Sequence, residues 1–120
     1  MKTLVLGLLT VTCCGMASQV AQAAGESGYV TIVSTAMSTN LGNNVQIRVS
    51  SPPTTPASCS THAAWHFTLS LDTAAGKNLY ALILLAKTAG TTVWISGTNV
   101  CSEIGNIESL RAITTYEAAP

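Results

Sequence analysis

The sequence predicts a mainly β domain of the α+β class, in which one helix follows three strands and precedes two more. In five separate segments, apolar residues alternate with polar ones or β-branched residues cluster, as is typical of strands. Between the third and fourth of these segments, the apolar spacing changes from every second residue to the helical period. A chain of 120 residues is long enough for one such domain.

Residues 1–23 have the pattern of a signal peptide, so we expect the single domain to comprise residues 24–120. Lys2 supplies a positive charge, and a short apolar run follows it. Ala21 and Ala23 place small side chains where signal peptidase requires them, which predicts cleavage after Ala23. The apolar run is shorter than the roughly 20 residues that span a bilayer. We therefore expect a secreted or periplasmic protein without a transmembrane segment.

The sequence contains four cysteines, of which two lie in the expected signal peptide. The residues before Cys13 and Cys14 match a lipoprotein signal poorly, so we expect both cysteines to be lost rather than lipidated. Cys59 and Cys101 remain, and an oxidising compartment favours their pairing as a disulfide. A metal site or a reactive thiol is the competing interpretation, but neither cysteine has a C-x-x-C partner.

The first two strands are expected at residues 29–37 and 45–50, joined by a cluster of turn-forming residues. The earlier segment is rich in β-branched residues, and the later one alternates cleanly. We expect residues 24–28 to be loose. Residues 51–56 contain three prolines, which lack the N–H group that a sheet requires, so they predict a loop leading to Cys59.

The third strand has the clearest alternation in the sequence and is expected at residues 65–72. One face carries large apolar side chains that should enter the core, and the other is polar. The expected core residues are Trp65, Phe67, Leu69 and Leu71.

The helix is expected at residues 74–87, with Asp72 or Thr73 as its N-cap and Gly90 at its end. No charged side chain occurs from residue 79 to residue 86, although a helix on the surface of a small domain should have a polar face. Two explanations stay open: the helix is sunk in its own core, or its second face meets another subunit. In the second case the oligomer interface would comprise Tyr80, Leu84 and Leu85.

The last two strands are expected at residues 91–96 and 109–116. The resulting order, β-β-β-α-β-β, is that of the OB-fold, a five-stranded Greek-key barrel with its helix between strands three and four. A β-sandwich or an open α+β sheet of the same order is the alternative.

A pattern from Cys59 to Leu110 resembles a family of small secreted bacterial proteins. It comprises a cysteine before an aromatic strand, a helix, and the segment Val93-Trp94-Ile95-Ser96-Gly97-Thr98-Asn99-Val100-Cys101. More distantly, the chain is similar to the B subunits of subtilase-cytotoxin-like and pertussis-like toxins. That resemblance implies an OB-fold, ring-shaped pentamers with helices lining the pore, and binding of sialylated glycans. The resemblance carries none of the sugar-binding residues of those toxins over to positions of this chain.

Charge and motifs argue against several classes of function. The formal net charge is 0 and no basic patch is visible, so we do not expect a nucleic-acid partner. His62 and His66 lack further ligands at a metal spacing, and we expect no metal site and no cofactor. Glu103 and Glu108 are expected in a solvated loop. Without a nucleophile motif or a cofactor motif, we expect no enzymatic activity and no catalytic residues.

Three side chains are candidates for binding a ligand, because strand alternation points them outward: Arg48, His66 and Trp94. Arg48 and His66 would lie on the strand 2–3 face that OB-folds commonly use, and an exposed tryptophan can stack on a sugar ring. Alternatively, Trp94 covers the helix and Arg48 only adds solubility. We therefore expect an exported, non-enzymatic binding domain, glycan-directed and oligomeric like a toxin B subunit. The alternative is an envelope component that contacts a protein partner and has no sugar site.

Overall fold

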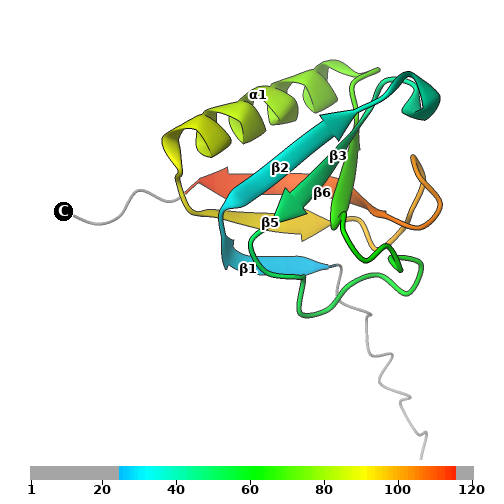
Figure 1. Ribbon diagram of the computed structural model, residues 1–120, viewed down its shortest axis with the longest axis horizontal. Coiled ribbons are helices and arrows are strands. Elements are labelled where there is room, and N and C mark those ends of the chain that lie inside the picture. Colours follow the sequence, from blue (N-terminus) through cyan, green and yellow to red (C-terminus); the bar gives the residue numbers. More distant parts are fainter. Residues whose placement is uncertain (1–24, 116–120) are drawn as a thin grey trace, which may run out of the picture.

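A computed structural model describes residues 25–115 of the chain (Figure 1). As predicted, these described residues form a mainly β structure with one α-helix, but they contain six strands instead of five. The elements are β1 (Glu26–Val30), β2 (Ile32–Met37), β3 (Asn44–Val49), β4 (Phe67–Ser70), α1 (Ala74–Ala89), β5 (Val93–Gly97) and β6 (Glu108–Thr115), with a short 3-10 turn at Thr39–Leu41. The expected signal peptide lies outside the described residues.

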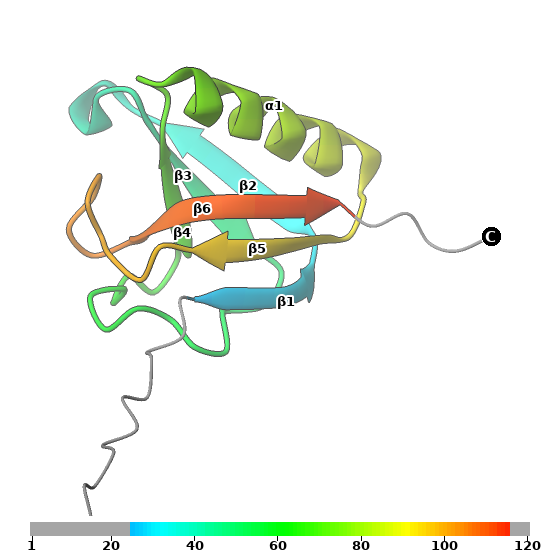
Figure 2. The same ribbon diagram turned by 180° about the vertical axis from the view of Figure 1, so that it is seen from behind.

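The six strands form one mixed sheet in the order β1-β5-β6-β4-β3-β2. All neighbouring strands are antiparallel except β4 and β6, which are parallel. Strands β1 and β2 occupy opposite edges of the sheet, although only Thr31 separates them in the sequence. The sheet therefore curls until its two edges approach each other, as Figures 1 and 2 show.

The prediction of one strand over residues 29–37, preceded by a loose segment, was wrong. This part of the chain begins pairing at Glu26 and changes partner at Thr31, since β1 pairs with β5 and β2 pairs with β3. Ser50 satisfies the backbone at the break: Thr31 N–H donates to Ser50 Oγ (3.1 Å), and Ser50 N–H donates to the Thr31 carbonyl (3.0 Å). The additional strand also places the helix between β4 and β5.

Helix α1 packs across the curled sheet and contacts β2, β4 and β6. Of the two predicted N-cap candidates, Asp72 and Thr73, the structure has Thr73, whose Oγ1 accepts a hydrogen bond from Gly76 N–H (3.0 Å). Gly90 ends the helix in the left-handed conformation that glycine adopts readily. The helix buries Ile83 and Ala86 against the core. The buried core cluster comprises Val30, Ile32, Val45, Ile47, Val49, Phe67, Leu69, Ile83, Ala86, Val93, Ile95 and Leu110.

Trp65 was predicted to enter the core with the third strand, and that part of the prediction was wrong. Strand β4 begins only at Phe67, and Trp65 is half-buried outside the core cluster. The cause is a turn at His62, whose Nδ1 accepts hydrogen bonds from the N–H groups of Ala64 (3.1 Å) and Trp65 (3.2 Å). These two bonds hold the chain at Trp65 in the turn, before the strand begins.

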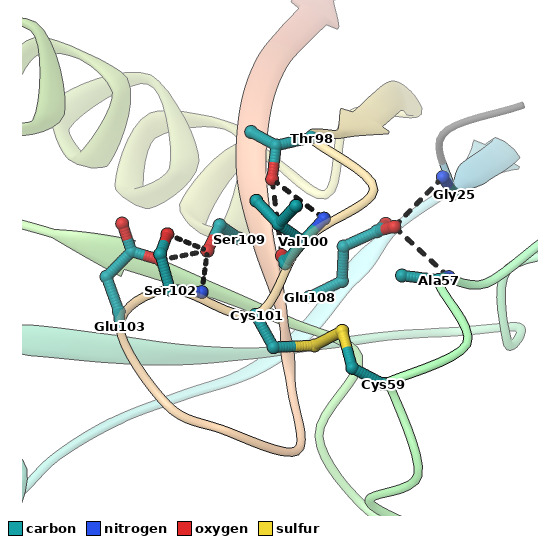
Figure 3. The surroundings of a disulfide bond; sticks show 10 residues. All are labelled: Gly25, Ala57, Cys59, Thr98, Val100, Cys101, Ser102, Glu103, Glu108 and Ser109. Atoms are coloured by element: carbon teal, nitrogen blue, oxygen red, sulfur yellow. Dashed lines mark hydrogen bonds between the residues drawn. A yellow bond between two sulfur atoms is a disulfide. The ribbon is translucent and has the colours of Figure 1, made fainter. Parts of the chain in front are cut away.

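The Cys59–Cys101 disulfide is confirmed, with 6.2 Å between the Cα atoms and a sequence separation of 42. Cys59 lies in the loop between β3 and β4, and Cys101 lies in the loop between β5 and β6 (Figure 3). The bond therefore joins two loops that are distant in sequence, and it fits an oxidising compartment.

Replacing both cysteines by alanine should lower the free energy of unfolding by about 4 kcal/mol, because the unfolded chain then regains the freedom of a long loop. Urea denaturation of the double variant measures this loss, and the unaltered protein in a thiol reductant is the matched control. Equal unfolding midpoints for the oxidised and reduced proteins would contradict the prediction.

Candidate functional site

The structure groups two of the three residues predicted to bind a ligand. The pairing of strand β3 with β4 ends at Ile47↔Phe67, and the positions that follow, Arg48 and His66, lie near each other. The Arg48 side chain is exposed and that of His66 is half-buried. Trp94 is on β5, which β6 and β4 separate from β3 in the sheet. These three residues therefore do not form one site.

The hydrogen bonds of His66 give it a structural role. Its Nδ1 accepts from Val49 N–H (3.1 Å), and its own N–H donates to the Ile47 carbonyl (3.0 Å). Burial of the ring, together with the adjacent positive charge of Arg48, holds the pKa of His66 below its ordinary value of 6.5. The neutral imidazole thus ties the end of β3 to the segment before β4.

The lowered pKa of His66 predicts a pH-dependent stability. The folded state disfavours the imidazolium, so this contribution to stability is complete above the ordinary pKa of 6.5. It declines as the pH falls from there towards the lower pKa of the folded state. The His66→Asn variant keeps an acceptor for Val49 N–H but does not titrate, so its free energy of unfolding should fall less steeply between about pH 7 and pH 5.

Urea titrations at each pH give these slopes. An Arg48→Gln variant removes the smaller of the two causes of the shift, so its slope should lie between those of the other two proteins. If the His66→Asn variant followed the slope of the unaltered protein, His66 would not be the titrating group.

Trp94 lies beside Tyr29, a residue that the sequence did not single out. The two residues pair across β1 and β5, with ring centroids 5.2 Å apart and an angle of 84° between the ring planes. Such an edge-to-face contact is the favoured arrangement of aromatic rings. Tyr29 is 63% exposed and Trp94 is half-buried, so the pair forms a partly exposed aromatic surface.

The carboxylate of Glu26 completes this surface. It accepts hydrogen bonds from Trp94 Nε1 and from Ser96 Oγ, whose distances to the two carboxylate oxygens are 3.0 and 3.2 Å. The bond from Nε1 holds the indole ring against Glu26. We call Glu26, Tyr29, Trp94 and Ser96 the aromatic patch. Its rings can stack on an apolar face of a ligand, and its oxygens can bond to hydroxyl groups.

Sequence reasoning found Trp94 but missed Glu26, because residues 24–28 were expected to be loose, and it did not connect Tyr29 with Trp94. A signal was nevertheless available. An OB-type strand order pairs the first strand with the fourth, which would have suggested Tyr29 and Trp94 as neighbours. The exact register could not be predicted, because β1 contains an irregularity between Glu26 and Tyr29.

The predicted interface residues of α1 differ in how far their side chains are exposed to solvent. Leu84 is 40% exposed and Leu85 is 66% exposed, whereas Tyr80 is half-buried and packs against the core cluster. Leu82, which the sequence did not single out, is 39% exposed. We call Leu82, Leu84 and Leu85 the helix face.

Side chains that could bind a metal ion or act in catalysis are sparse in the part of the chain that the structure describes. No three histidine, cysteine or acidic side chains gather there in a way that could hold a metal ion. A surface hollow of about 300 Å³ is lined by Met37, Ser38, Thr39 and Gly42, none of which titrates near neutral pH. Between residues 25 and 115, no helix is both long enough and apolar enough to cross a bilayer.

Comparison with protein-family models, curated proteins and solved structures gives no significant match to this chain. The function therefore has to be argued from the geometry of the aromatic patch and the helix face.

Proposed function

We propose that this protein is an exported binding domain without enzymatic activity, built on an OB-like barrel, and that its aromatic patch binds a glycan. If β1 and β2 are counted as one bent strand, the sheet has five strands. Their order then corresponds to that of an OB barrel, including the parallel pair of the third and fifth strands. The observation that carries the binding proposal is the edge-to-face pair of Tyr29 and Trp94 beside the Glu26 carboxylate.

The chemistry of the patch favours a neutral saccharide. The apolar face of a sugar ring can lie against Tyr29, and sugar hydroxyls can donate to Glu26 or Ser96. Glu26 is the charged member of the patch, and its negative charge would repel the carboxylate of a sialic acid. The proposal therefore departs from the sialylated ligands that the toxin resemblance implies.

Replacing Tyr29 by serine should weaken glycan binding at least about tenfold, because the exposed ring supplies the stacking surface. A glycan array with the exported form identifies the ligand, and calorimetry then compares the variants. Val33→Ser is the matched control, since Val33 is an exposed strand residue (46%) on the opposite edge strand. No bound glycan on the array, or equal affinities for both variants, would reject the sugar site.

The helix face supports a second proposed function, which is binding to another polypeptide. Three exposed leucines lie on a helix with no charged side chain from residue 79 to residue 86, which is unusual for a surface in contact with water. A second copy of the chain would cover these leucines in a ring of subunits. A different envelope protein would cover them if the protein has a structural role.

In the ring proposal, Leu85→Lys should convert an oligomer into monomers, because it buries an unpaired charge in the interface. Gel filtration with light scattering measures the mass, with Val33→Lys as the matched control. A strictly monomeric unaltered protein would reject the ring. The envelope alternative then predicts capture of a protein partner and loss of that capture in the Leu85→Lys or the Trp94→Ala variant.

A further inference from the structure

Glu26 contributes a carboxylate to the aromatic patch, and every hydrogen bond that this carboxylate accepts comes from a neutral group. The donors are Trp94 Nε1 and Ser96 Oγ. No lysine or arginine between residues 25 and 115 forms an ion pair with Glu26. The carboxylate is half-buried, so water and salt screen its charge less than that of a fully exposed side chain. The aromatic patch therefore presents an uncompensated negative charge.

The same carboxylate has acceptor sites left for a ligand. A carboxylate can accept hydrogen bonds at about four sites. The Ser96 hydroxyl lies 3.0 and 3.2 Å from the two oxygens, but it has one hydrogen and fills one site. The indole N–H of Trp94 fills another. About two sites remain for groups on a ligand.

The backbone of Glu26 is held in place without any ligand. Glu26 pairs with Ser96 of β5 on one side, and on the other side its carbonyl accepts a hydrogen bond from Thr54 N–H (3.2 Å). Thr54 belongs to the loop between β3 and β4. A ligand that binds to Glu26 therefore does not have to order this part of the chain, and ordering is a cost that weakens binding to flexible sites.

One positive side chain, Arg111, lies on the outer face of β1, β5 and β6, three strands that are side by side in Figure 2. Arg111 is the additional residue of a bulge in β6, between the pairs Ser96↔Ala112 and Gly97↔Leu110, and its side chain is exposed. It belongs to the second strand from Glu26 and does not contact it. Arg111 thus reduces the negative potential of the patch without neutralising it.

We propose that the glycan bound by the aromatic patch carries a protonated primary amine, and that Glu26 is the residue that recognises this amine. This inference rests on the proposed glycan binding and specifies the group that Glu26 contacts. An ammonium group donates to a carboxylate in a charge-assisted hydrogen bond, which is stronger than the bond from a neutral hydroxyl. The charge that repels an acidic sugar therefore favours a sugar with an amine over one with hydroxyl groups only.

Glu26 and Tyr29 are close enough for one short oligosaccharide to contact both. They are three residues apart on β1, so their Cα atoms are at most about 11 Å apart. Both side chains also contact Trp94. A sugar ring can therefore stack on Tyr29 while an amine on the same ring or on the next one reaches Glu26. Glu26 then determines specificity, whereas Tyr29 supplies affinity for either kind of sugar.

Two tetrasaccharides provide the test, one of β-linked glucose and one of β-linked glucosamine, in which an amine replaces one hydroxyl of each ring. At a pH at which the amine is protonated, calorimetry should give at least about fivefold higher affinity for the glucosamine form. Glu26→Gln removes the charge, so the two affinities should become equal within about twofold. Tyr29→Ser should lower both affinities and preserve their ratio. Glu103→Gln is the matched control, since it removes a hydrogen-bonded carboxylate outside the patch and should also preserve the ratio.

Salt provides a second measurement, which keeps the test decisive if Glu26→Gln does not fold. The preference for the amine should decline as sodium chloride is added, because Glu26 is within reach of dissolved ions, while the affinity for the glucose form stays constant. Equal affinities for the two tetrasaccharides, a preference that survives in Glu26→Gln, or array hits confined to glycans without an amine would each overturn the inference and leave glycan binding in place. Binding to no glycan at all, with or without an amine, would reject the proposed function and this inference together.

Discussion

The segment that passes from β1 to β2 imposes the constraint on which the rest of the structure depends. It supplies both edges of the sheet, and the single residue Thr31 connects them, with its backbone groups bonded to Ser50. One residue cannot span the width of a flat six-stranded sheet. The sheet must therefore curl, and in doing so it encloses its apolar face. Helix α1 then covers part of the enclosed core. The same segment places Tyr29 beside Trp94 on the outer side of β5.

At one end of the domain, polar and covalent links add to the burial of Ala57 and Ile107. The disulfide joins the β3–β4 loop to the β5–β6 loop, and Glu108 bonds to Ala57 within the first of these loops. Hydrogen bonds connect Gly25 to both Glu108 and Gly97. Glu108 and the disulfide thus restrain the same β3–β4 loop, so their contributions to stability should be coupled.

Local features were predictable from the sequence, whereas features set by strand partners were not. The helix cap at Thr73 and the glycine at its end follow from rules that act within one turn, and the disulfide follows from cysteine counting. The break at Thr31 leaves no local signal, because β-branched residues flank it on both sides. Alternation correctly placed Arg48 outward, but it could not place Glu108, whose burial depends on glycines distant in sequence.

The two surfaces proposed for binding lie on opposite sides of the domain, since Figures 1 and 2 both place α1 and β1 far apart. Subunits that associated through the helix face would therefore leave the aromatic patch of each copy accessible. Weak stacking by one aromatic pair gives modest affinity for a sugar, but several patches on one assembly raise the effective concentration of the second contact. Self-association and glycan binding would then support each other, and a variant that only dissociates the subunits should weaken binding to a surface more than binding to a soluble sugar.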